Sequence, residues 1–321
     1  MNMAFSAQST GEEVSQILSG QIKGSNALIT GVTPGSIGFT AALHISQHKP
    51  NLLILAGRNI SSLKTAQDTI LSTTAHAPTI KLLVLDLSSQ ESIRQAAAEV
   101  NSYPDPITHL VNSAGVMASP YATTADGIEL QFGTNHIGHF LFTNLVLPRV
   151  LSSAGTLRVV NVSSAGHKRG PVRFDDIGFN NGQDYDKWAA YGQSKTANML
   201  FSVSLAQKLS DKGVEAFSLY PGRILTGIAR HLKDEEMMKA GWMREDGSLI
   251  QDPKLNWRSL SQTAATLIVA TYDGSISGRN GSYMVNNVVS NGDAEEYALD
   301  PVNAERLWML SEELVGQKFT Y

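Results

Sequence analysis

Tyr191 and Lys195 are the two side chains of this sequence that are best spaced for proton chemistry. They lie four residues apart within residues 188–209, where apolar residues recur at roughly helical spacing. Because residues i and i+4 share one face of a helix, the phenol and the ammonium group should project side by side. A neighbouring cation lowers the pKa of a phenol, but one exposed lysine does not supply the roughly three units, about 4 kcal/mol, needed to reach neutrality. The charge of a cofactor would have to help; the alternative is a surface tyrosine packed on the aliphatic part of the lysine.

Ser164 is a hydroxyl-bearing residue expected near the same place. It follows a strand predicted over residues 158–163, and its hydroxyl could donate a hydrogen bond to an oxygen atom there. Residues 165–186 are rich in Gly, Asn and Asp without a regular period. A loop of that length is usually functional or disordered, and this one joins Ser164 to Tyr191. We therefore expect residues 165–186 to form an active-site loop.

Asn135 lies in the middle of a helical pattern over residues 124–148, beside glycine and threonine residues that are unfavourable in a helix. A conflict between local sequence and structure is expected at functional sites, which makes Asn135 a candidate. The alternative is that the glycines allow close helix packing. We interpret His136 and His139 as packing or polar-face residues, since a histidine at a helix centre is more often structural than a ligand.

Glycines follow the first predicted core strand, residues 26–30. Gly31, Gly35 and Gly38 precede a helix predicted over residues 39–48. Backbone N–H groups at a helix N-terminus, with no side chains to block the approach, can cradle a pyrophosphate. The succession of strand, glycine turn and helix therefore predicts a dinucleotide site.

Arg58 follows the second predicted strand, residues 52–56, and precedes a helix predicted over residues 61–71. In a dinucleotide site the end of this strand meets the adenosine ribose, where an acid binds the 2′-hydroxyl and an arginine suits a 2′-phosphate. The sequence has the arginine and no acid at this place. It therefore favours NADP(H) over NAD(H), whereas the alternative is an exposed arginine in a turn.

Three further strands are predicted over residues 80–85, 109–112 and 214–220. Strands that alternate with helical patterns indicate an α/β fold with a doubly wound parallel sheet of the Rossmann type. Such sheets bind ligands beyond the carboxyl ends of the strands. Two polar residues besides those named above follow strand ends, namely Asp86 and Asn112.

The C-terminal part of the chain is expected to cover the substrate. Residues 223–260 contain several methionine, tryptophan and aliphatic residues, which suit a lid over a hydrophobic substrate; ordinary core or a subunit contact would explain them equally well. A helix is predicted over residues 261–272 and a last edge strand over residues 281–285. Asp300 is expected to cap a final helix that ends near Gly316.

The N-terminal residues 1–23 are expected to form an arm and a short helix outside a single catalytic domain of residues 24–321. Residues 1–9 have the character of a loose arm. Thr10 and Glu13 fit a capping box, and the helix should run through Leu18 and stop at Gly20.

The composition excludes several classes of site and partner. The chain has 321 residues, 42% of them hydrophobic, which is enough for a large core. Without cysteine it can form neither disulfides nor thiolate zinc sites, and no metal site is predicted. A net charge of −4 and the lack of a basic block make nucleic acid and anionic membranes unsuitable partners. Neither a signal peptide nor an apolar run of membrane-spanning length is evident, so we expect a cytoplasmic protein without a membrane anchor.

Several of these motifs occur together and in order in one protein family. The chain resembles the short-chain dehydrogenase/reductase family over residues 24–307, and is most similar to its retinol-dehydrogenase-like branch and to related fungal enzymes. The residues that carry the resemblance are Thr30 and Gly31 with the glycine turn, Asp86 and Leu87, Asn112 to Gly115, Asn135, Val162 to Ser164, Tyr191 with Lys195, and Pro221 and Gly222 with Thr226.

The resemblance implies a role for each catalytic candidate. Tyr191 would be the general acid or base, and Lys195 would hold the nicotinamide ribose and lower the Tyr191 pKa. Ser164 would orient the substrate oxygen, and it is preferred to Ser163 because the second serine matches the family's catalytic position. Asn135 would hold the water of a proton relay behind Lys195.

The resemblance also implies that Asp86 contacts the adenine and that the turn from Pro221 to Thr226 contacts the nicotinamide carboxamide. The full set of predicted cofactor-binding residues is Gly31, Thr33, Gly35, Ser36, Ile37, Gly38, Arg58, Asp86, Leu87, Asn112, Ala114, Gly115, Tyr191, Lys195, Pro221, Gly222, Ile224 and Thr226.

Two features depart from the family pattern. Gly31 and Gly35 are followed by two residues, rather than one, before Gly38. In one interpretation Ser36 replaces the middle glycine of the motif and one residue is inserted beside it. In the other, Gly35 is the middle glycine and the turn is one residue longer. In both, the geometry of phosphate binding differs from that of the usual family turn. The distance from Ser164 to Tyr191 along the chain also exceeds that of compact members of the family.

The sequence thus predicts an oxidoreductase that transfers hydride between NADP(H) and a carbonyl or secondary alcohol of a small apolar molecule. We expect reduction of a ketone or aldehyde, because Arg58 favours the cofactor that cells keep reduced. The resemblance implies a homodimer or homotetramer, and its fungal side suggests a ketoreductase of secondary metabolism. The alternatives are an alcohol-oxidising dehydrogenase of a biosynthetic pathway and a catalytically silent NADP(H)-binding scaffold or sensor.

Overall fold

The computed structural model describes residues 5–152 and 156–321. Within these residues the strands form one sheet in the order β3-β2-β1-β4-β5-β6-β7-β8. All neighbouring pairs are parallel except β7 and β8. The strands are β1 (Asn26–Thr30), β2 (Leu52–Gly57), β3 (Thr79–Val84), β4 (His109–Asn112), β5 (Leu157–Val162), β6 (Val214–Tyr220), β7 (Tyr283–Val285) and β8 (Val288–Val289).

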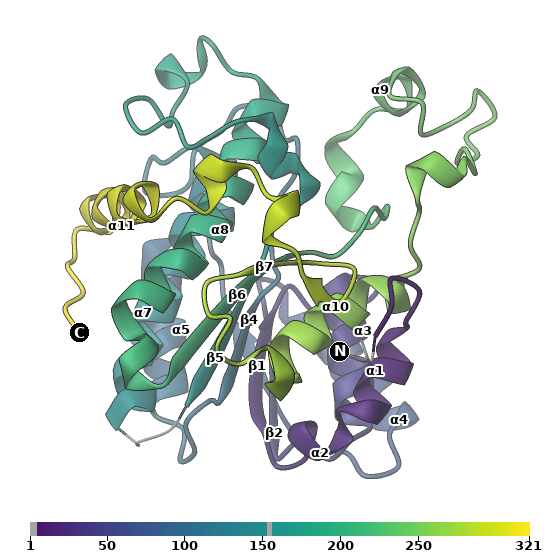
Figure 1. The fold of residues 1–321 in the computed structure, drawn as a ribbon, viewed down its shortest axis with the longest axis vertical. Coiled ribbons are helices and arrows are strands. Elements are labelled where there is room, and N and C mark those ends of the chain that lie inside the picture. The colour runs from purple at the N-terminus through teal and green to yellow at the C-terminus, as the bar shows by residue number, and fades with distance from the viewer. Residues whose placement is uncertain (1–4, 153–155) are drawn as a thin grey trace.

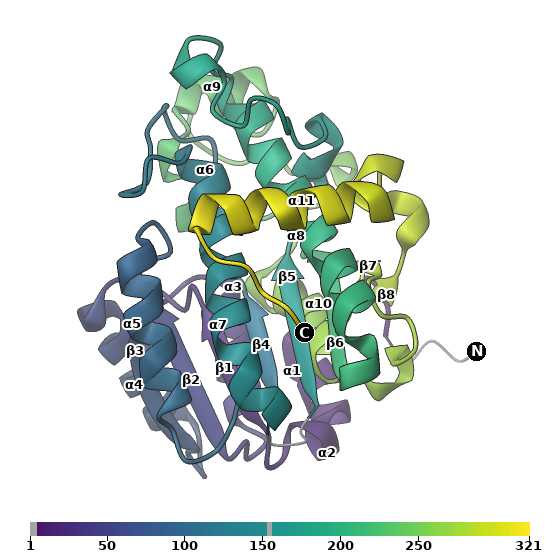
Figure 2. The same cartoon turned by 90° about the vertical axis from the view of Figure 1, so that its left-hand side faces the viewer.

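Helices cover both faces of this sheet, as Figures 1 and 2 show. One face carries α1 (Gly11–Ile17), α3 (Ile37–Ser46), α4 (Ile60–Thr73) and α10 (Leu260–Tyr272). The opposite face carries α5 (Gln90–Asn101), α7 (Gly138–Ser152), α8 (Lys187–Leu209) and α11 (Pro301–Val315). The predicted α/β fold with a doubly wound parallel sheet is therefore confirmed.

The central strands are buried on both faces because successive side chains point to opposite sides of the sheet. On β1, for example, Leu28 belongs to the core under α5 and α7, while its neighbours Ala27 and Ile29 belong to the core under α3 and α10. The strand order reverses direction between β1 and β4. The loops that leave these two strands therefore diverge and open a crevice at the carboxyl edge of the sheet.

The N-terminal helix differs from its prediction at its end. The capping box of Thr10 and Glu13 is present, with Thr10 Oγ1 accepting from the Glu13 N–H at 3.3 Å. Gly20 does not stop the chain, however, because it lies inside a further helical turn, α2 (Ser19–Ile22). The side chain of Ile22 is fully buried in the core, and this tertiary contact outweighs the low helix propensity of glycine. Of the loose arm predicted over residues 1–9, residues 1–4 lie outside the described residues.

The helix predicted over residues 124–148 begins later and is not regular. It starts at α6 (Leu130–Phe132), where the Glu129 carboxylate accepts from two backbone N–H groups. A π-helical turn, Gly133–Ile137, then separates α6 from α7. The helix also continues past Pro148, which cannot bond to the carbonyl oxygen of Asn144. The hydroxyl of Tyr321 contacts that oxygen instead at 3.3 Å, so the gap in the helix is filled from elsewhere in the fold.

The strand predicted as the last edge strand is also corrected. β7 lies inside the sheet, because the chain turns back at Asn286 and Asn287 and adds β8 outside it. Both asparagines have positive φ angles, 52° and 70°, as a two-residue hairpin turn requires. The other predicted elements that were given boundaries differ from the structure by a residue or two at their ends.

Residues 223–260 form a separate part of the molecule beyond the carboxyl edge of the sheet. They contain the short helix α9 (Asp234–Lys239) and two 3₁₀ turns, Gly227–His231 and Pro253–Leu255. Figures 1 and 2 show α9 at the same end of the molecule as residues 165–186. The two segments predicted to border the substrate therefore lie at one end of the sheet.

Candidate active site

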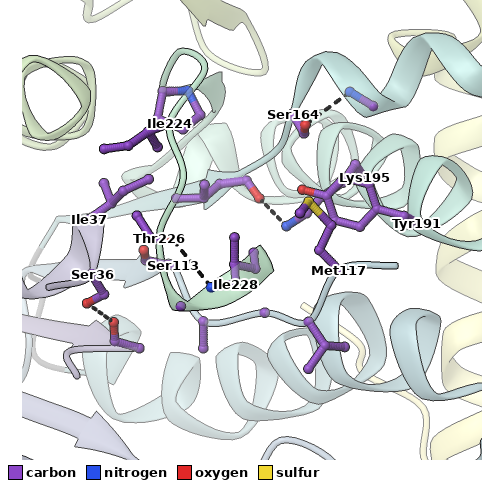
Figure 3. A pocket seen from close by; sticks show the side chains of 18 of the residues that line it. Ser36, Ile37, Ser113, Met117, Ser164, Tyr191, Lys195, Ile224, Thr226 and Ile228 are labelled. Carbon is purple, nitrogen blue, oxygen red and sulfur yellow. Dashed lines mark hydrogen bonds between the residues drawn. The ribbon is translucent and has the colours of Figure 1, made fainter. Parts of the chain in front are cut away.

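A cavity of about 590 Å³ lies at the carboxyl edge of the sheet. Its walls come from the residues that follow β1, β2, β4, β5 and β6, from α8, and from the 223–260 segment. Figure 3 shows Ser36 and Ile37 on one side of this cavity and Tyr191 and Lys195 on the other. The cavity is in the position where open parallel sheets bind their ligands.

The cavity brings together most of the predicted site residues. Those that line it are Gly31, Thr33, Gly35, Ser36, Ile37, Arg58, Leu87, Ala114, Gly115, Ser164, Tyr191, Lys195, Pro221, Gly222, Ile224 and Thr226. Four predicted residues do not belong to the lining, namely Gly38, Asp86, Asn112 and Asn135. Gly38 supports the turn from within, since a Cβ atom there would lie 2.9 Å from the carbonyl oxygen of Gly31.

The side chains of Asp86 and Asn112 form hydrogen bonds with other residues of the protein and do not line the cavity. The Asp86 carboxylate accepts from the backbone N–H of Ser88 at 2.9 Å and from its hydroxyl at 2.6 Å. The buried Asn112 amide donates to Thr143 Oγ1 at 3.2 Å and to Asn161 Oδ1 at 2.9 Å. In this structure both residues therefore hold the loops that leave β3 and β4.

The glycine turn contains two positions that only glycine occupies without strain. Gly31 has a φ of +75°, and a Cβ atom there would lie 2.7 Å from Ala114 Cα. Gly35 has a φ of +83°. Ser36 is the N-cap of α3, since its hydroxyl accepts from the Phe39 N–H at 3.1 Å and donates to the Gly31 carbonyl at 2.7 Å. Of the two interpretations of this turn, the structure therefore shows the second, a longer turn in which Gly35 takes the left-handed conformation and Ser36 begins the helix.

This turn fits the pyrophosphate of a dinucleotide. No protein atom lies within 4 Å of the place where a Cβ of Gly35 would be, so a ligand can approach the backbone from the cavity. The first turn of α3 follows directly, and the N–H groups at a helix start attract anions. The added residue lengthens the turn without filling the space in front of the helix.

Two arginines meet at the far end of the cavity. Arg58 follows β2, Arg230 belongs to the 223–260 segment, and both line the cavity. Burial lowers the pKa of Arg230, and the nearby positive charge of Arg58 lowers it further. Among the described residues, neither arginine has a carboxylate within 4 Å. Two neighbouring cations without an acid form a site for a strongly charged anion.

Tyr191 and Lys195 project from one face of α8 into the opposite end of the cavity (Figure 3). The helix starts at Asp186, whose carboxylate caps it by accepting from two backbone N–H groups. Lys195 Nζ lies 5.7 Å from the centre of the Tyr191 ring and donates to the carbonyl oxygen of Val162 at 3.0 Å. The bond to the end of β5 fixes the ammonium group beside the phenol, as the spacing of four residues predicted.

Ser164, and not Ser163, presents its hydroxyl to this part of the cavity. Ser163 Oγ donates to the carbonyl oxygen of Lys195 at 2.8 Å and is buried against α8. Ser164 Oγ accepts from the Gly166 N–H at 3.0 Å, and its hydrogen bond with Tyr191 lowers the pKa of that phenol. The preference for Ser164 therefore has a geometric basis.

Burial dominates the acid–base properties of the pair. It raises the pKa of Tyr191 to about 12, although the hydrogen bond with Ser164 acts in the other direction. Burial also lowers the pKa of Lys195 to about 8, because the buried ammonium group loses its hydration. In the protein alone, the phenol is therefore protonated at neutral pH, and Lys195 by itself does not bring the Tyr191 pKa toward neutrality.

Asn135 holds the wall of the cavity from behind. In the π-helical turn its amide donates to the Val116 carbonyl and to Ser194 Oγ, both at 2.9 Å, and its Oδ1 accepts from the Val116 N–H at 2.8 Å. A Cβ atom on Gly115 would lie 2.9 Å from Asn135 Oδ1 and 3.6 Å from Lys195 Nζ. Asn135 therefore lies close behind Lys195 without itself lining the cavity.

His136 and His139 are buried structural residues, as the sequence indicated. His136 Nε2 bonds to Ser311 Oγ at 2.8 Å. His139 Nδ1 donates to the carbonyl oxygen of Asn135 at 3.0 Å, and its Nε2 bonds to Thr30 Oγ1 at 2.9 Å. Burial lowers the pKa of His139 to about 4, so the ring is neutral and Thr30 donates to it. This histidine connects the end of β1 to the π-helical turn.

Several residues of the lining were not identified as site residues from the sequence. They include Met117, Arg169, Trp188, Arg230 and Trp257. Trp188 lies three residues before Tyr191 on the same helix, so its spacing is a signal that could have been used. Arg169 lies in the predicted active-site loop, and Arg230 and Trp257 lie in the predicted lid. The sequence therefore indicated these segments, but which of their side chains face the cavity depends on tertiary contacts.

Among residues 5–152 and 156–321, no helix combines the length and apolar character needed to cross a bilayer.

The cavity, its glycine turn and its Tyr–Ser–Lys group can be compared with known proteins. The family model described as enoyl-(acyl carrier protein) reductase matches residues 31–247.

Individual proteins resemble the chain over most of its length. Human retinol dehydrogenase 13 is 34% identical over 92% of this chain and 86% of its own. The short-chain dehydrogenase/reductase prx1 of Penicillium rubens is 36% identical over 72% of this chain and 69% of its own. A crystal structure of an uncharacterised Mycobacterium paratuberculosis protein aligns with a TM-score of 0.70 and 30% identity, covering 93% of this chain and 96% of that one. The chain belongs to the short-chain dehydrogenase/reductase family, with retinol-dehydrogenase-like relatives, and is an oxidoreductase of the kind that uses a nicotinamide cofactor.

Proposed function

We propose that this enzyme uses NADPH to reduce the carbonyl group of a small, largely apolar ketone or aldehyde, with Tyr191 as the general acid. The observation that carries the proposal is the position of Tyr191, Ser164 and Lys195 at one end of a cavity whose other end is a glycine turn. One extended ligand can contact both ends, and a carbonyl compound can enter beside Tyr191.

The choice of NADPH rests on the adenosine end of the cavity. Arg58 lies at the end of β2, next to the place where a 2′-phosphate would bind. Arg230 approaches Arg58 from the 223–260 segment. The lining of the cavity contains neither Asp nor Glu. A ribose with a free 2′-hydroxyl would leave both guanidinium groups without an anion.

Ser164 and Tyr191 would hold the substrate oxygen between their hydroxyl groups, and these bonds polarise the carbonyl. Bound NADPH supplies a hydride to the carbonyl carbon. As the oxygen gains charge, the Tyr191 phenol gives it a proton, and the alcohol forms. A phenolate is left beside Lys195, whose ammonium group stabilises it until a proton is returned from solvent.

Lys195 has a second function in this proposal. In the structure its Nζ donates to the Val162 carbonyl, which leaves two further donors. These would bind the hydroxyls of the nicotinamide ribose. After hydride transfer the nicotinamide would be cationic. Its charge would then add to that of Lys195 in stabilising the phenolate of Tyr191, whose pKa burial has raised to about 12.

Titration with NADPH and, separately, with NADH tests the cofactor assignment. Both reduced nicotinamides gain fluorescence and shift to shorter wavelength when they are bound in an apolar site. We expect tight binding of NADPH and weak binding of NADH. Equal affinity would contradict the role of Arg58, and failure of both to bind would show that the lengthened glycine turn has disabled the site.

Three expectations stay predictions without further support. They are the direction of the reaction in the cell, a cytoplasmic location, and a homodimeric or homotetrameric assembly. The proposal that this enzyme is a ketoreductase of secondary metabolism likewise awaits identification of the substrate. Product analysis with purified enzyme and both oxidation states of the cofactor would decide the direction.

A further inference from the structure

Three of the four tryptophans of the protein line the same cavity. Trp188 lies on α8, one turn before Tyr191, and Trp242 and Trp257 come from the 223–260 segment. The ring centres are 6.5 Å apart between Tyr191 and Trp188, 6.2 Å between Trp188 and Trp242, and 6.4 Å between Trp242 and Trp257. All three contacts are edge to face. The rings therefore form a continuous aromatic wall that begins at the phenol.

The guanidinium group of Arg223 lies at the far end of this aromatic wall. Its carbon Cζ is 5.6 Å from the centre of the Trp242 ring and 5.8 Å from that of Trp257. The backbone near Arg223 is held as well, since its carbonyl accepts from the Arg258 N–H at 2.9 Å. A cation placed against two rings keeps a defined position, while the N–H groups at its edge stay available.

Nothing acidic balances this charge within the described residues. No carboxylate lies within 4 Å of Arg223, and the cavity lining contains no Asp or Glu. Its polar neighbour is the hydroxyl of Tyr220, which shares a side-chain hydrogen bond with Arg223. Burial nevertheless raises the pKa of Tyr220, so this neighbour is neutral and does not balance the charge. Arg169 adds a second cation to the wall, with its Cζ 4.9 Å from the centre of the Trp188 ring. The substrate end of the cavity thus combines flat apolar surfaces with positive charge.

These features define a ligand by its shape and charge. Aromatic rings prefer to stack offset or edge to face on other rings, so the wall suits a planar, fused-ring body. A guanidinium group binds a carboxylate through two parallel hydrogen bonds. A flexible aliphatic chain would use neither the geometry of the rings nor the unpaired cation.

We infer that the substrate is a planar aromatic ketone or aldehyde that bears a carboxylate, with its rings on the aromatic wall and its carboxylate on Arg223. The inference rests on the proposed function, because it assigns the carbonyl to Tyr191. It names the substrate class more narrowly than an apolar carbonyl compound, and it gives Arg223 a role in substrate selection.

A matched pair of probes separates the contribution of the aromatic rings to binding from that of the carboxylate. The probes are 6-acetyl-2-naphthoate and 2-acetylnaphthalene, which have the same rings and the same ketone but differ in the carboxylate. We expect the naphthoate to bind the wild-type protein about 10-fold more tightly, because it alone forms charge-assisted hydrogen bonds. Isothermal titration calorimetry measures both dissociation constants, on the protein alone and on the protein saturated with NADP⁺.

Two arginine variants localise the effect. In Arg223→Gln the naphthoate should bind no more tightly than acetylnaphthalene. Arg306→Gln is the matched control, because the Arg306 guanidinium also stacks on an aromatic ring, 4.4 Å from the centre of Phe174, but is not part of the cavity. This control should keep the 10-fold preference. Equal binding of the two probes to the wild-type protein, or an equal loss of both in Arg223→Gln, would overturn the inference.

Trp188→Leu tests the aromatic wall separately, because Arg223 stacks on Trp242 and Trp257 and not on Trp188. It should weaken both probes by a similar factor and leave the preference for the carboxylate unchanged. Unaltered affinity for both probes would show that the rings do not contact the ligand. Circular dichroism and NADPH fluorescence of each variant establish that it is folded.

The calorimetric readout also separates this inference from the proposed function, because it needs no turnover. Selective binding of the naphthoate without oxidation of NADPH would support the binding site and contradict the reductase. Reduction of both ketones with equal dissociation constants would support the reductase and contradict the role of Arg223.

Discussion

The two ends of the cavity are built in different ways. At the cofactor end the backbone is tied together by buried hydrogen bonds: Thr30 Oγ1 accepts from the N–H groups of Ser113 and Ala114, each at 3.0 Å, and contacts His139. At the substrate end, residues 223–260 pack through a small apolar cluster with Leu232 and Met237 as its buried members from this segment. A rigid site suits one constant cofactor, whereas a loosely packed one can adapt to a substrate.

The attachment of the substrate end is correspondingly sparse. Lys187 at the start of α8 pairs with Glu236 on α9. The isolated bridges of Arg223 with Trp257 and of Met243 with Leu249 lie within the segment and do not attach it to the sheet. The buried polar contacts are concentrated at the proposed cofactor end, and we therefore expect the substrate end to be the more mobile of the two.

The largest effect is expected for Tyr191→Phe, which removes the proposed proton donor at the end of the cavity opposite the glycine turn. The value of kcat/KM for ketone reduction should fall by about 10³-fold, because general acid catalysis commonly contributes factors of 10²–10⁴. NADPH fluorescence should still report binding. Tyr121→Phe is the matched control, since Tyr121 is an exposed phenol that is not part of the cavity, and it should keep full activity. An active Tyr191→Phe enzyme would refute the assignment.

The next effect is expected for Arg58→Gln at the cofactor end. Loss of one charge-assisted contact to a 2′-phosphate costs about 1.5–3 kcal/mol, so NADPH should bind about 10-fold to 100-fold more weakly. NADH affinity should stay nearly constant, because it has no phosphate there. Fluorescence titration measures both, and a parallel loss of the two cofactors would point to a structural defect.

A pair of glycine substitutions separates backbone strain from ligand contact. Gly35→Ala and Gly24→Ala place a Cβ at φ angles of +83° and +77°, and neither new atom would meet the protein within 4 Å. Both should cost about 1 kcal/mol of stability in thermal unfolding. Only Gly35→Ala should also weaken NADPH, by about 10-fold, since only Gly35 lines the cavity. Similar cofactor affinity in both variants would show that the turn does not approach the pyrophosphate.

The buried Lys195 predicts a pH dependence of stability. Its folded pKa of about 8 lies below the unfolded value of 10.5, so between these values the unfolded chain binds more protons. The free energy of unfolding should therefore rise with pH in this window, by at most about 1.4 kcal/mol per unit. Above pH 10 the ionisation of Tyr191 should lower the free energy of unfolding as the pH rises, because burial raises its folded pKa to about 12. Urea unfolding between pH 8 and 10 should show a smaller slope for Lys195→Met; an identical slope would contradict a buried, titrating lysine.

The smallest effect concerns the mobility of the substrate end. Trypsin should cut first within residues 223–260, where Arg230, Lys233, Lys239 and Arg244 are exposed on short elements. NADP⁺ together with 6-acetyl-2-naphthoate should slow these cuts a few fold by reducing local opening. Mass spectrometry locates the cleavage sites. A first cut in the glycine turn, or none in this segment, would reverse the contrast between the two ends.

Features that depend on short-range spacing could be predicted from the sequence. The strands followed by Gly31, Arg58 and Ser164 were predicted because buried parallel strands are apolar and end in turn residues. Tyr191 and Lys195 were placed on one helix face because the helix period is local. The family resemblance rests on these same short motifs, and the comparisons confirm it.

The contacts between distant segments could not be predicted from the sequence and became known from the three-dimensional structure. It placed Trp188 against Trp242 and Trp257, brought Arg230 to Arg58, and turned Asn135 toward Val116 through a π-helical turn. It also overrode local propensity at Gly20 and at Pro148, where a buried side chain and a hydroxyl from the C-terminus compensate for the weak helix former. These outcomes depend on contacts between residues far apart in the chain, and such contacts leave no periodic signal in the sequence.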